Sequence, residues 1–277
     1  MRGLFIHIKR LFLLGIVTVL IGSCTKPKTE LILLGTVHQP VENFNADSLY
    51  NILVRISPDV ILYEVDSSFF TDQFEFNTSW KSNEYKATSK YANLNEVIIR
   101  PYDFTGRNEY RKAIGARPTD GLAKALLDSL YQTGLLNPAD QLQYESYLRV
   151  NDTLNALAYY GAASFNNPAT DSIAQSRQQL QYESLAKIME QYPVFSDIHY
   201  QMENGDSISF LDGYKRAGEF WKMRNEAMSK HILHFVKTYP GKRILVLNGF
   251  FHRYYLNKLL LPVCNEHDFV IKNFDEY

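Results

Sequence analysis

Apolar residues along the chain follow two different spacings. Short, nearly continuous apolar runs, such as LILLG at 31–35, have the length and composition of buried strands. Residues 45–57 instead repeat their apolar side chains at helical spacing, with Asn45 or Asp47 available to cap the helix. The further strand-like runs are 58–66, 96–103, 242–248 and 268–274, and a second helical stretch follows at 251–261. This order of strands and helices predicts an α/β fold with a mostly parallel central sheet.

The middle of the chain, from about residue 105 to 240, has a different pattern. Strand-like runs disappear there, and Leu, Ala and Tyr recur at helical spacing among many polar residues. Asn-Pro pairs at 137–138 and 167–168 and a Tyr-Pro pair at 192–193 divide the stretch into several helices. We therefore expect residues 31–277 to form one α/β domain. Its sheet comes from the N- and C-terminal parts, and the middle is a helical insertion.

The first 23 residues form a segment of their own. A basic start is followed by an apolar run of 13 residues, which is too short for a permanent membrane-spanning helix. The residues before Cys24 read Leu-Ile-Gly-Ser and resemble the lipobox of bacterial lipoproteins. The resemblance implies that residues 1–23 are a signal peptide, that Cys24 carries lipid, and that residues 24–30 are a tether. A plain secretory signal is the alternative.

Lipid on Cys24 would anchor the protein to a membrane of the bacterial cell envelope. Thr25 rather than Asp follows the cysteine, which by analogy with lipoprotein sorting favours the outer membrane. Without residues 1–23 the chain keeps 26 Lys and Arg against 30 Asp and Glu. Because no basic patch stands out, nucleic acid is not an expected partner. Cys264 is then the one cysteine besides Cys24, so neither a disulfide framework nor a CxxC metal site is expected.

Two histidines stand at equivalent places after two of the predicted strands. His38 follows the first run by the step Gly35-x-x-His, and His252 follows a late run by the step Gly249-x-x-His. Glu64 ends the run between them. Ligands of parallel sheets bind beyond the carboxyl ends of the strands, so these side chains are expected at one edge. Two imidazoles and a carboxylate suit a catalytic metal site. The alternative is two hydrogen-bonded histidines that end core strands.

The two glycines have a physical role in this prediction. A residue without Cβ lets the chain turn sharply and approach a ligand, so Gly35 and Gly249 would aim the histidines over the strand ends. Asp66 and Asp103 also follow strand-like runs and are candidate proton shuttles. Arg224 falls on the apolar stripe of the helical stretch 218–236. A buried Arg needs an anion, either Glu64, a substrate group or a structural carboxylate.

The motifs together resemble a known family. GTVH at 35–38, GFFH at 249–252, Glu64 and the pair Arg224-Asn225 are similar to the TraB/PrgY/GumN and Tiki family, within the wider EreA/ChaN-like superfamily. The resemblance implies a metal-dependent hydrolase, a peptidase in Tiki proteins, acting on a peptide or small molecule. It places His38, His252 and Glu64 at a divalent metal such as Mn, Co or Zn, and Arg224 and Asn225 in the catalytic site.

Two other functions are consistent with the same residues. ChaN-like relatives suggest a haem- or iron-binding lipoprotein, with His38, His252 or a tyrosine as axial ligand. A non-catalytic interaction protein of the envelope is the other alternative. The sequence contains no GxSxG elbow, P-loop or GxGxxG, so serine hydrolase and nucleotide sites have no support. His231 and His234 are expected to be surface residues.

Overall fold

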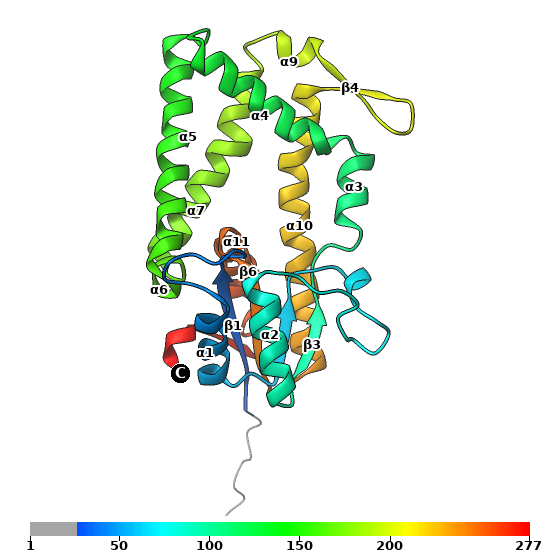
Figure 1. The fold of residues 1–277 in the computed structure, drawn as a ribbon, viewed down its shortest axis with the longest axis vertical. Helices are drawn as coiled ribbons and strands as arrows, with labels where there is room; N and C mark the ends of the chain where they lie inside the picture. Colours follow the sequence, from blue (N-terminus) through cyan, green and yellow to red (C-terminus); the bar gives the residue numbers. More distant parts are fainter. Residues whose placement is uncertain (1–26) are drawn as a thin grey trace, which may run out of the picture.

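The computed structural model describes residues 27–277 and has a five-stranded parallel sheet at its centre (Figure 1). The strands are β1 (Thr29–Thr36), β2 (Val60–Tyr63), β3 (Ile98–Pro101), β6 (Arg243–Gly249) and β7 (Phe269–Lys272). Their order is β3-β2-β6-β1-β7, and each neighbouring pair is parallel. The expected signal peptide and Cys24 lie outside the described residues.

Helices cover both faces of this sheet. On one face, α1 (Ala46–Ile56) and α2 (Asn83–Leu94) pack over side chains such as Ile32 and Leu34. On the other face, the C-terminal half of α10 (Phe210–Thr238) and α11 (Phe250–Leu260) pack over side chains such as Leu31 and Leu33. Successive residues of a strand point to opposite faces. The central strands β1, β2 and β6 are almost continuously apolar because both of their faces are buried.

The remaining helices rise beyond the carboxyl ends of the strands (Figure 1). They are α3 (Arg107–Ala113), α4 (Ala116–Gln132), α5 (Pro138–Leu157), α6 (Ala162–Phe165), α7 (Pro168–Gln179), α8 (Leu185–Met189) and α9 (Val194–Asp197), and a π-helical turn (Leu180–Ser184) joins α7 to α8. A third apolar core, including Leu127, Phe195 and Tyr214, holds α4, α5, α8 and α9 to the N-terminal half of α10. None of the helices in residues 27–277 is long and apolar enough to cross a membrane.

The α/β fold with a parallel sheet and a helical insertion is confirmed. The Asn-Pro pairs do start helices, because Asn137 and Asn167 each accept a hydrogen bond from the first turn that follows. Asn45, rather than Asp47, caps α1.

Two boundaries and two elements differ from the sequence-based expectation. β1 begins at Thr29, inside the expected tether, because Glu30 pairs with Arg243 on β6. The insertion ends before residue 240, since the C-terminal half of α10 covers the sheet. Helix α2 was missed because few of its residues are apolar, and its buried face includes Asn83 and Glu84. A hairpin of β4 (His199–Gln201) and β5 (Ser207–Ser209) was also missed, since three-residue strands carry almost no pattern.

Candidate active site

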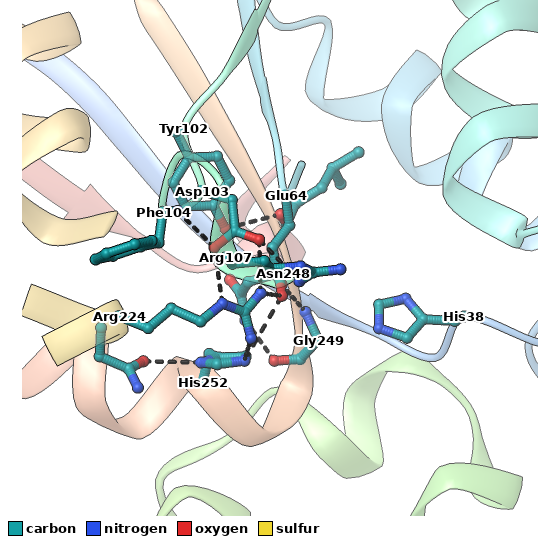
Figure 2. Close-up of polar contacts among 12 residues, drawn as sticks. His38, Glu64, Tyr102, Asp103, Phe104, Arg107, Arg224, Asn248, Gly249 and His252 are labelled. Carbon is teal, nitrogen blue, oxygen red and sulfur yellow. Dashed lines mark hydrogen bonds and ion pairs between the residues drawn. The ribbon is translucent and has the colours of Figure 1, made fainter. Parts of the chain in front are cut away.

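Arg224 lies at the centre of a hydrogen-bonded cluster beyond the ends of β2 and β6 (Figure 2). Its Nε and Nη2 donate to the two carboxylate oxygens of Asp103 at 2.7 and 2.9 Å. Nη2 also donates to Oε1 of Glu64 at 2.5 Å. Nη1 donates to Nε2 of His252 at 3.0 Å. The predicted residues Glu64, Asp103, Arg224 and His252 therefore do converge, and a guanidinium joins them.

The charges of the cluster are balanced inside the protein. Arg107 adds a second cation, since its Nη1 donates to Asp103 Oδ2 at 2.8 Å. Two arginines thus face the carboxylates of Glu64 and Asp103. Burial alone would lower the pKa of Arg224, but these two carboxylates outweigh burial and raise it above its ordinary value. Arg224 is a permanent cation whose partners are negatively charged protein groups.

His252 is buried and neutral. It sits in the first turn of α11, and its ring stacks on the indole of Trp221 with centroids 4.2 Å apart. Burial, followed by the charge of Arg224, holds its pKa well below the ordinary value. Nε2 accepts the Arg224 hydrogen bond, so Nδ1 carries the proton and donates to Oδ1 of Asn225 at 2.8 Å. Asn225 in turn donates to the Trp221 carbonyl at 2.7 Å, which fixes its orientation.

In contrast to His252, His38 is exposed and protonated at neutral pH. It lies in the loop after β1 with 61% of its side chain exposed, and its Nδ1 is 2.9 Å from Oε1 of the buried Glu84. The hydrogen bond with Glu84 raises the pKa of His38 to about 9. Burial raises the pKa of Glu84, but hydrogen bonds from His38 and from Thr36 Oγ1 (2.6 Å) leave it lowered. At neutral pH the two residues form an imidazolium–carboxylate pair.

Gly249 separates the two histidines. Its N–H donates to Oε2 of Glu64 at 2.6 Å. A Cβ placed on Gly249 would lie 3.4 Å from Nε2 of His38 and 3.7 Å from Oε2 of Glu64. The free Nε2 of His38 and the Glu64 carboxylate therefore face the same small space, beside Gly249 (Figure 2).

The two glycines do not turn the chain through a left-handed conformation. Neither Gly35 nor Gly249 has a positive φ. Gly35 is needed because it leaves space for a neighbouring helix. A Cβ on Gly35 would lie 2.8 Å from the Cβ of Phe250, so Gly35 allows α11 to approach β1. The amide of Asn166 also bonds both backbone groups of Gly35.

A hollow of about 200 Å³ opens beside His38 and Glu64. Its walls include Thr36, His38, Tyr63, Glu64, Trp80, Glu84, Arg107, Asn248 and Gly249. Arg224, Asp103 and His252 do not line it and lie behind Glu64. The site thus has an outer half around His38, Glu84 and Arg107, and an inner half around Arg224 and His252.

Asp66 does not join either half. Its Oδ1 accepts from the backbone N–H of Ser68 at 2.8 Å, and its Oδ2 accepts from Gly106 N–H at 3.1 Å. These bonds cap the short 3-10 helix Ser67–Phe69 and tie down the loop before α3. Asp66 is therefore placed for a structural role rather than for a proton shuttle. His231 is also structural and half-buried, since its Nδ1 lies 2.9 Å from the Tyr102 carbonyl.

The residues implied as metal ligands do not form a ligand set as they are arranged. Within residues 27–277, no three His, Cys, Asp or Glu side chains are grouped to hold a metal ion. The reason is visible in the cluster: Arg224 occupies Nε2 of His252 and Oε1 of Glu64, which would have to face the ion. A metal held by both histidines and Glu64 requires the guanidinium to move away.

Three residues of the outer half were missed from sequence. Glu84 lies on the unpredicted helix α2, and Trp80 lies in the loop before it. Arg107 starts α3, a short helix with two further basic residues, so nothing in the sequence singles it out. The one available signal was Ser82, a residue type typical of a helix N-cap, which does cap α2.

No family model, curated protein or solved structure matches this chain. The resemblance to the TraB/PrgY/GumN and Tiki family therefore remains a hypothesis based on the motifs. The function has to be argued from the chemistry of the site.

Proposed function

We propose that this protein is a hydrolase that acts on an ester or amide carbonyl in the hollow beside His38. The observation that carries the proposal is the bond between His38 Nδ1 and the buried Glu84 carboxylate, with Nε2 left free on the side of Glu64 and Gly249. A carboxylate that holds one imidazole nitrogen while the other faces a pocket is the arrangement of a general base.

In this proposal, neutral His38 takes a proton from a water molecule through Nε2. Glu84 holds the ring and stabilises the imidazolium that forms. The water attacks the carbonyl carbon, and His38 then returns the proton to the leaving group. Arg107 lines the same hollow as a cation and is placed to stabilise the oxyanion.

The inner half has a positioning role. Arg224 and the Gly249 N–H hold the two oxygens of Glu64, so one carboxylate edge is fixed at the wall of the hollow. His252 is neutral and has both nitrogens occupied, and it acts by orienting Arg224. Asn225 acts through His252 in the same way.

The test is a screen of the purified protein with nitrophenyl esters and with chromogenic peptide amides. His38→Ala should abolish turnover, whereas His234→Ala, on an exposed part of α10, should not change it. Because His38 must be neutral to act, only about 1% of it is active at pH 7 when its pKa is about 9. Turnover should therefore rise with pH and level off above about 9. Equal turnover by His38→Ala would refute the proposal.

A metal-dependent hydrolase at the same place is the second candidate. It is favoured by the fact that Glu84 and Asn225 each occupy Nδ1 of one histidine, which leaves both Nε2 atoms on the side of Glu64. His38, His252 and Glu64 would hold Mn, Co or Zn, and the ion would supply an activated water. Elemental analysis of the wild type beside His38→Ala/His252→Ala decides it, since bound metal in the wild type alone supports this form.

Anchoring by lipid on Cys24, at the outer membrane of a bacterial envelope, is part of the proposal and rests on the sequence alone. In the fold, β1 starts at the end of the sheet away from the insertion helices (Figure 1), and its last residue, Thr36, lines the hollow. An anchor before β1 would leave the hollow facing away from the membrane. Cys24→Ser should move the protein from the membrane fraction to the soluble fraction, and unchanged retention would contradict the anchor.

No specific feature of the described residues favours the haem-binding alternative or the non-catalytic alternative. The hollow beside His38 has about 200 Å³ and charged walls, which is below the roughly 300–1,000 Å³ typical of sites for larger organic ligands. A Soret band on haem titration would favour the first alternative over hydrolysis.

A further inference from the structure

The hollow beside His38 has an apolar wall that the proposed chemistry does not use. The lining residues with large uncharged side chains are Tyr63, Val65, Trp80 and Leu247. Tyr63 and Trp80 stack on each other, with ring centroids 6.3 Å apart and planes 21° apart, so they form one surface. The hollow therefore offers an apolar surface next to the groups that would carry out the hydrolysis.

Trp80 is held in place before any substrate binds. Its indole packs edge-to-face against three more rings, with centroids 5.3, 5.8 and 5.4 Å away: Phe69, Phe76 and Tyr85. Three residues after Trp80, Asn83 bonds to the loop that carries His38. Its N–H donates to the His38 carbonyl at 2.9 Å, and its Nδ2 donates to the Val37 carbonyl at 2.7 Å. The fold thus fixes the position of Trp80 relative to His38.

The two ends of a bound substrate would lie in different surroundings. His38 has to reach the atom that leaves, because it returns the proton to the leaving group. The side chain of His38 is 61% exposed, whereas Tyr63 is 5% exposed, so the mouth of the hollow is on the side of His38 and the apolar wall is deeper. A leaving group at His38 therefore faces the solvent, and the acyl group lies against Tyr63 and Trp80.

The charges of the lining favour a neutral acyl group. Four charged side chains line the hollow, and each has a partner of opposite charge in the protein. The pairs are His38 with Glu84, Glu64 with Arg224, and Arg107 with Asp103. An acyl group with a charge of its own would lose hydration in the hollow without gaining an unpaired partner.

The volume of the hollow limits the length of the acyl group. Its 200 Å³ hold roughly seven groups of the size of a water molecule, at about 30 Å³ each. The attacking water and the carbonyl group occupy about three of these places, so about four remain. An acyl chain of about five carbons, counted with its carbonyl carbon, fills the hollow.

We infer that this protein acts on esters or amides of short, neutral, apolar carboxylic acids, and that Trp80 limits the length of the acyl chain. The inference rests on the proposed function, because it assigns the acyl side of the same reaction. One methylene group in an apolar pocket changes kcat/KM by about tenfold or more, so the wall is sufficient to select among chain lengths.

The test is the dependence of kcat/KM on acyl-chain length, measured with nitrophenyl acetate, butanoate, hexanoate and octanoate and with His38→Ala as the blank. We expect a maximum at butanoate or hexanoate and a fall of about tenfold or more at octanoate. Trp80→Ala removes the ring that limits the chain, so the ratio of octanoate to butanoate turnover should rise about tenfold or more. Trp80→Phe keeps a smaller ring and should give an intermediate ratio.

Phe74→Ala is the matched control. Phe74 is an aromatic residue of the same loop before α2 but does not line the hollow, so the ratio should stay unchanged. The ratio compares two substrates of one sample and does not depend on how much of a variant is folded. Nitrophenyl hydrogen succinate tests the charge, since its acyl group has the length of butanoate and ends in a carboxylate. Its kcat/KM should be about tenfold or more below that of butanoate.

The outcomes separate the inference from the proposed function. A steady rise of wild-type kcat/KM up to octanoate, a ratio that neither Trp80 variant changes, or faster turnover of the succinate ester than of butanoate would each overturn the inference and leave the hydrolase in place. Equal hydrolysis of all esters and chromogenic amides by the wild type and by His38→Ala would overturn the proposed function, and the inference with it.

Discussion

The two Gly-x-x-His steps produce histidines of opposite character. His38 lies on an exposed loop, is bonded to a carboxylate and has its pKa raised to about 9. His252 is buried under Trp221, is bonded to an amide and a guanidinium, and stays neutral. The same motif therefore gives a proton-transfer group in one place and a positioning group in the other. The difference comes from the partners, which the motif does not contain.

The largest effect is expected from the residue that joins the two halves. Arg224→Met leaves the carboxylates of Glu64 and Asp103 buried without their main cation. The free energy of unfolding should fall by about 3–5 kcal/mol, measured by urea denaturation at pH 7. Arg149→Met, on an exposed part of α5, is the control and should change it by less than about 0.5 kcal/mol. A loss below about 1 kcal/mol for Arg224→Met would mean that the buried carboxylates do not depend on Arg224 for their stability.

Replacing the two histidines should lower the free energy of unfolding in different ways. His252→Ala removes a buried ring from Trp221 and leaves Asn225 and Arg224 each short of a partner, so unfolding should become easier by about 2–4 kcal/mol. His38→Ala removes an exposed ring but also takes the cation away from the buried Glu84 carboxylate, so it should cost about 1–3 kcal/mol at pH 7. This loss should become smaller above pH 9, where His38 is neutral in the wild type, whereas the loss for His252→Ala should not depend on pH. Urea unfolding of both variants at pH 7 and pH 10 measures the difference, and the same pH dependence for both would remove the distinction between the two histidines.

Replacing the two glycines should also have different effects. Gly35→Ala should lower stability, and Gly249→Ala should lower turnover. Gly35→Ala brings a Cβ to 2.8 Å from Cβ of Phe250, and overpacking of this kind costs about 1–3 kcal/mol. Gly249→Ala meets only the 3.4 Å approach of His38 Nε2, so the fold should tolerate it. It fills the space that His38 and Glu64 face, so turnover should fall at least tenfold while stability stays within about 1 kcal/mol. Turnover that survives Gly249→Ala would place the reaction elsewhere.

The site residues that could be predicted from the sequence are mainly those that directly follow a predicted strand. Glu64, Asp103 and both histidines follow apolar runs that form parallel strands, and parallel strands bring such residues to one edge of the sheet. Arg224 was visible as a charge on an apolar helical stripe. These residues converge because all strands of the sheet are parallel, so their carboxyl ends lie on the same side whatever the strand order.

The parts that could not be predicted depend on contacts between distant segments. Glu84 determines the state of His38 from 46 residues away, on a helix with few apolar positions. Arg224 could have paired with an anion anywhere, and only the fold shows that it fills the place between Glu64 and His252. In the sequence, Asp66 and Asp103 both follow a strand-like run. In the fold, the backbone N–H groups of Ser68 and Gly106 donate hydrogen bonds to the Asp66 carboxylate and keep it out of the site.

The most direct test of the account is a nitrogen NMR titration of the two imidazole rings from pH 5 to 10. We predict that His38 stays protonated until its pKa near 9 is reached, and that Glu84→Gln moves this pKa down towards the ordinary value of about 6.5. We predict that His252 stays neutral throughout, with its proton on Nδ1. A His38 that titrates near 6.5 in the wild type, or a His252 that becomes protonated between pH 5 and 8, would contradict the division of roles on which the proposed hydrolase rests.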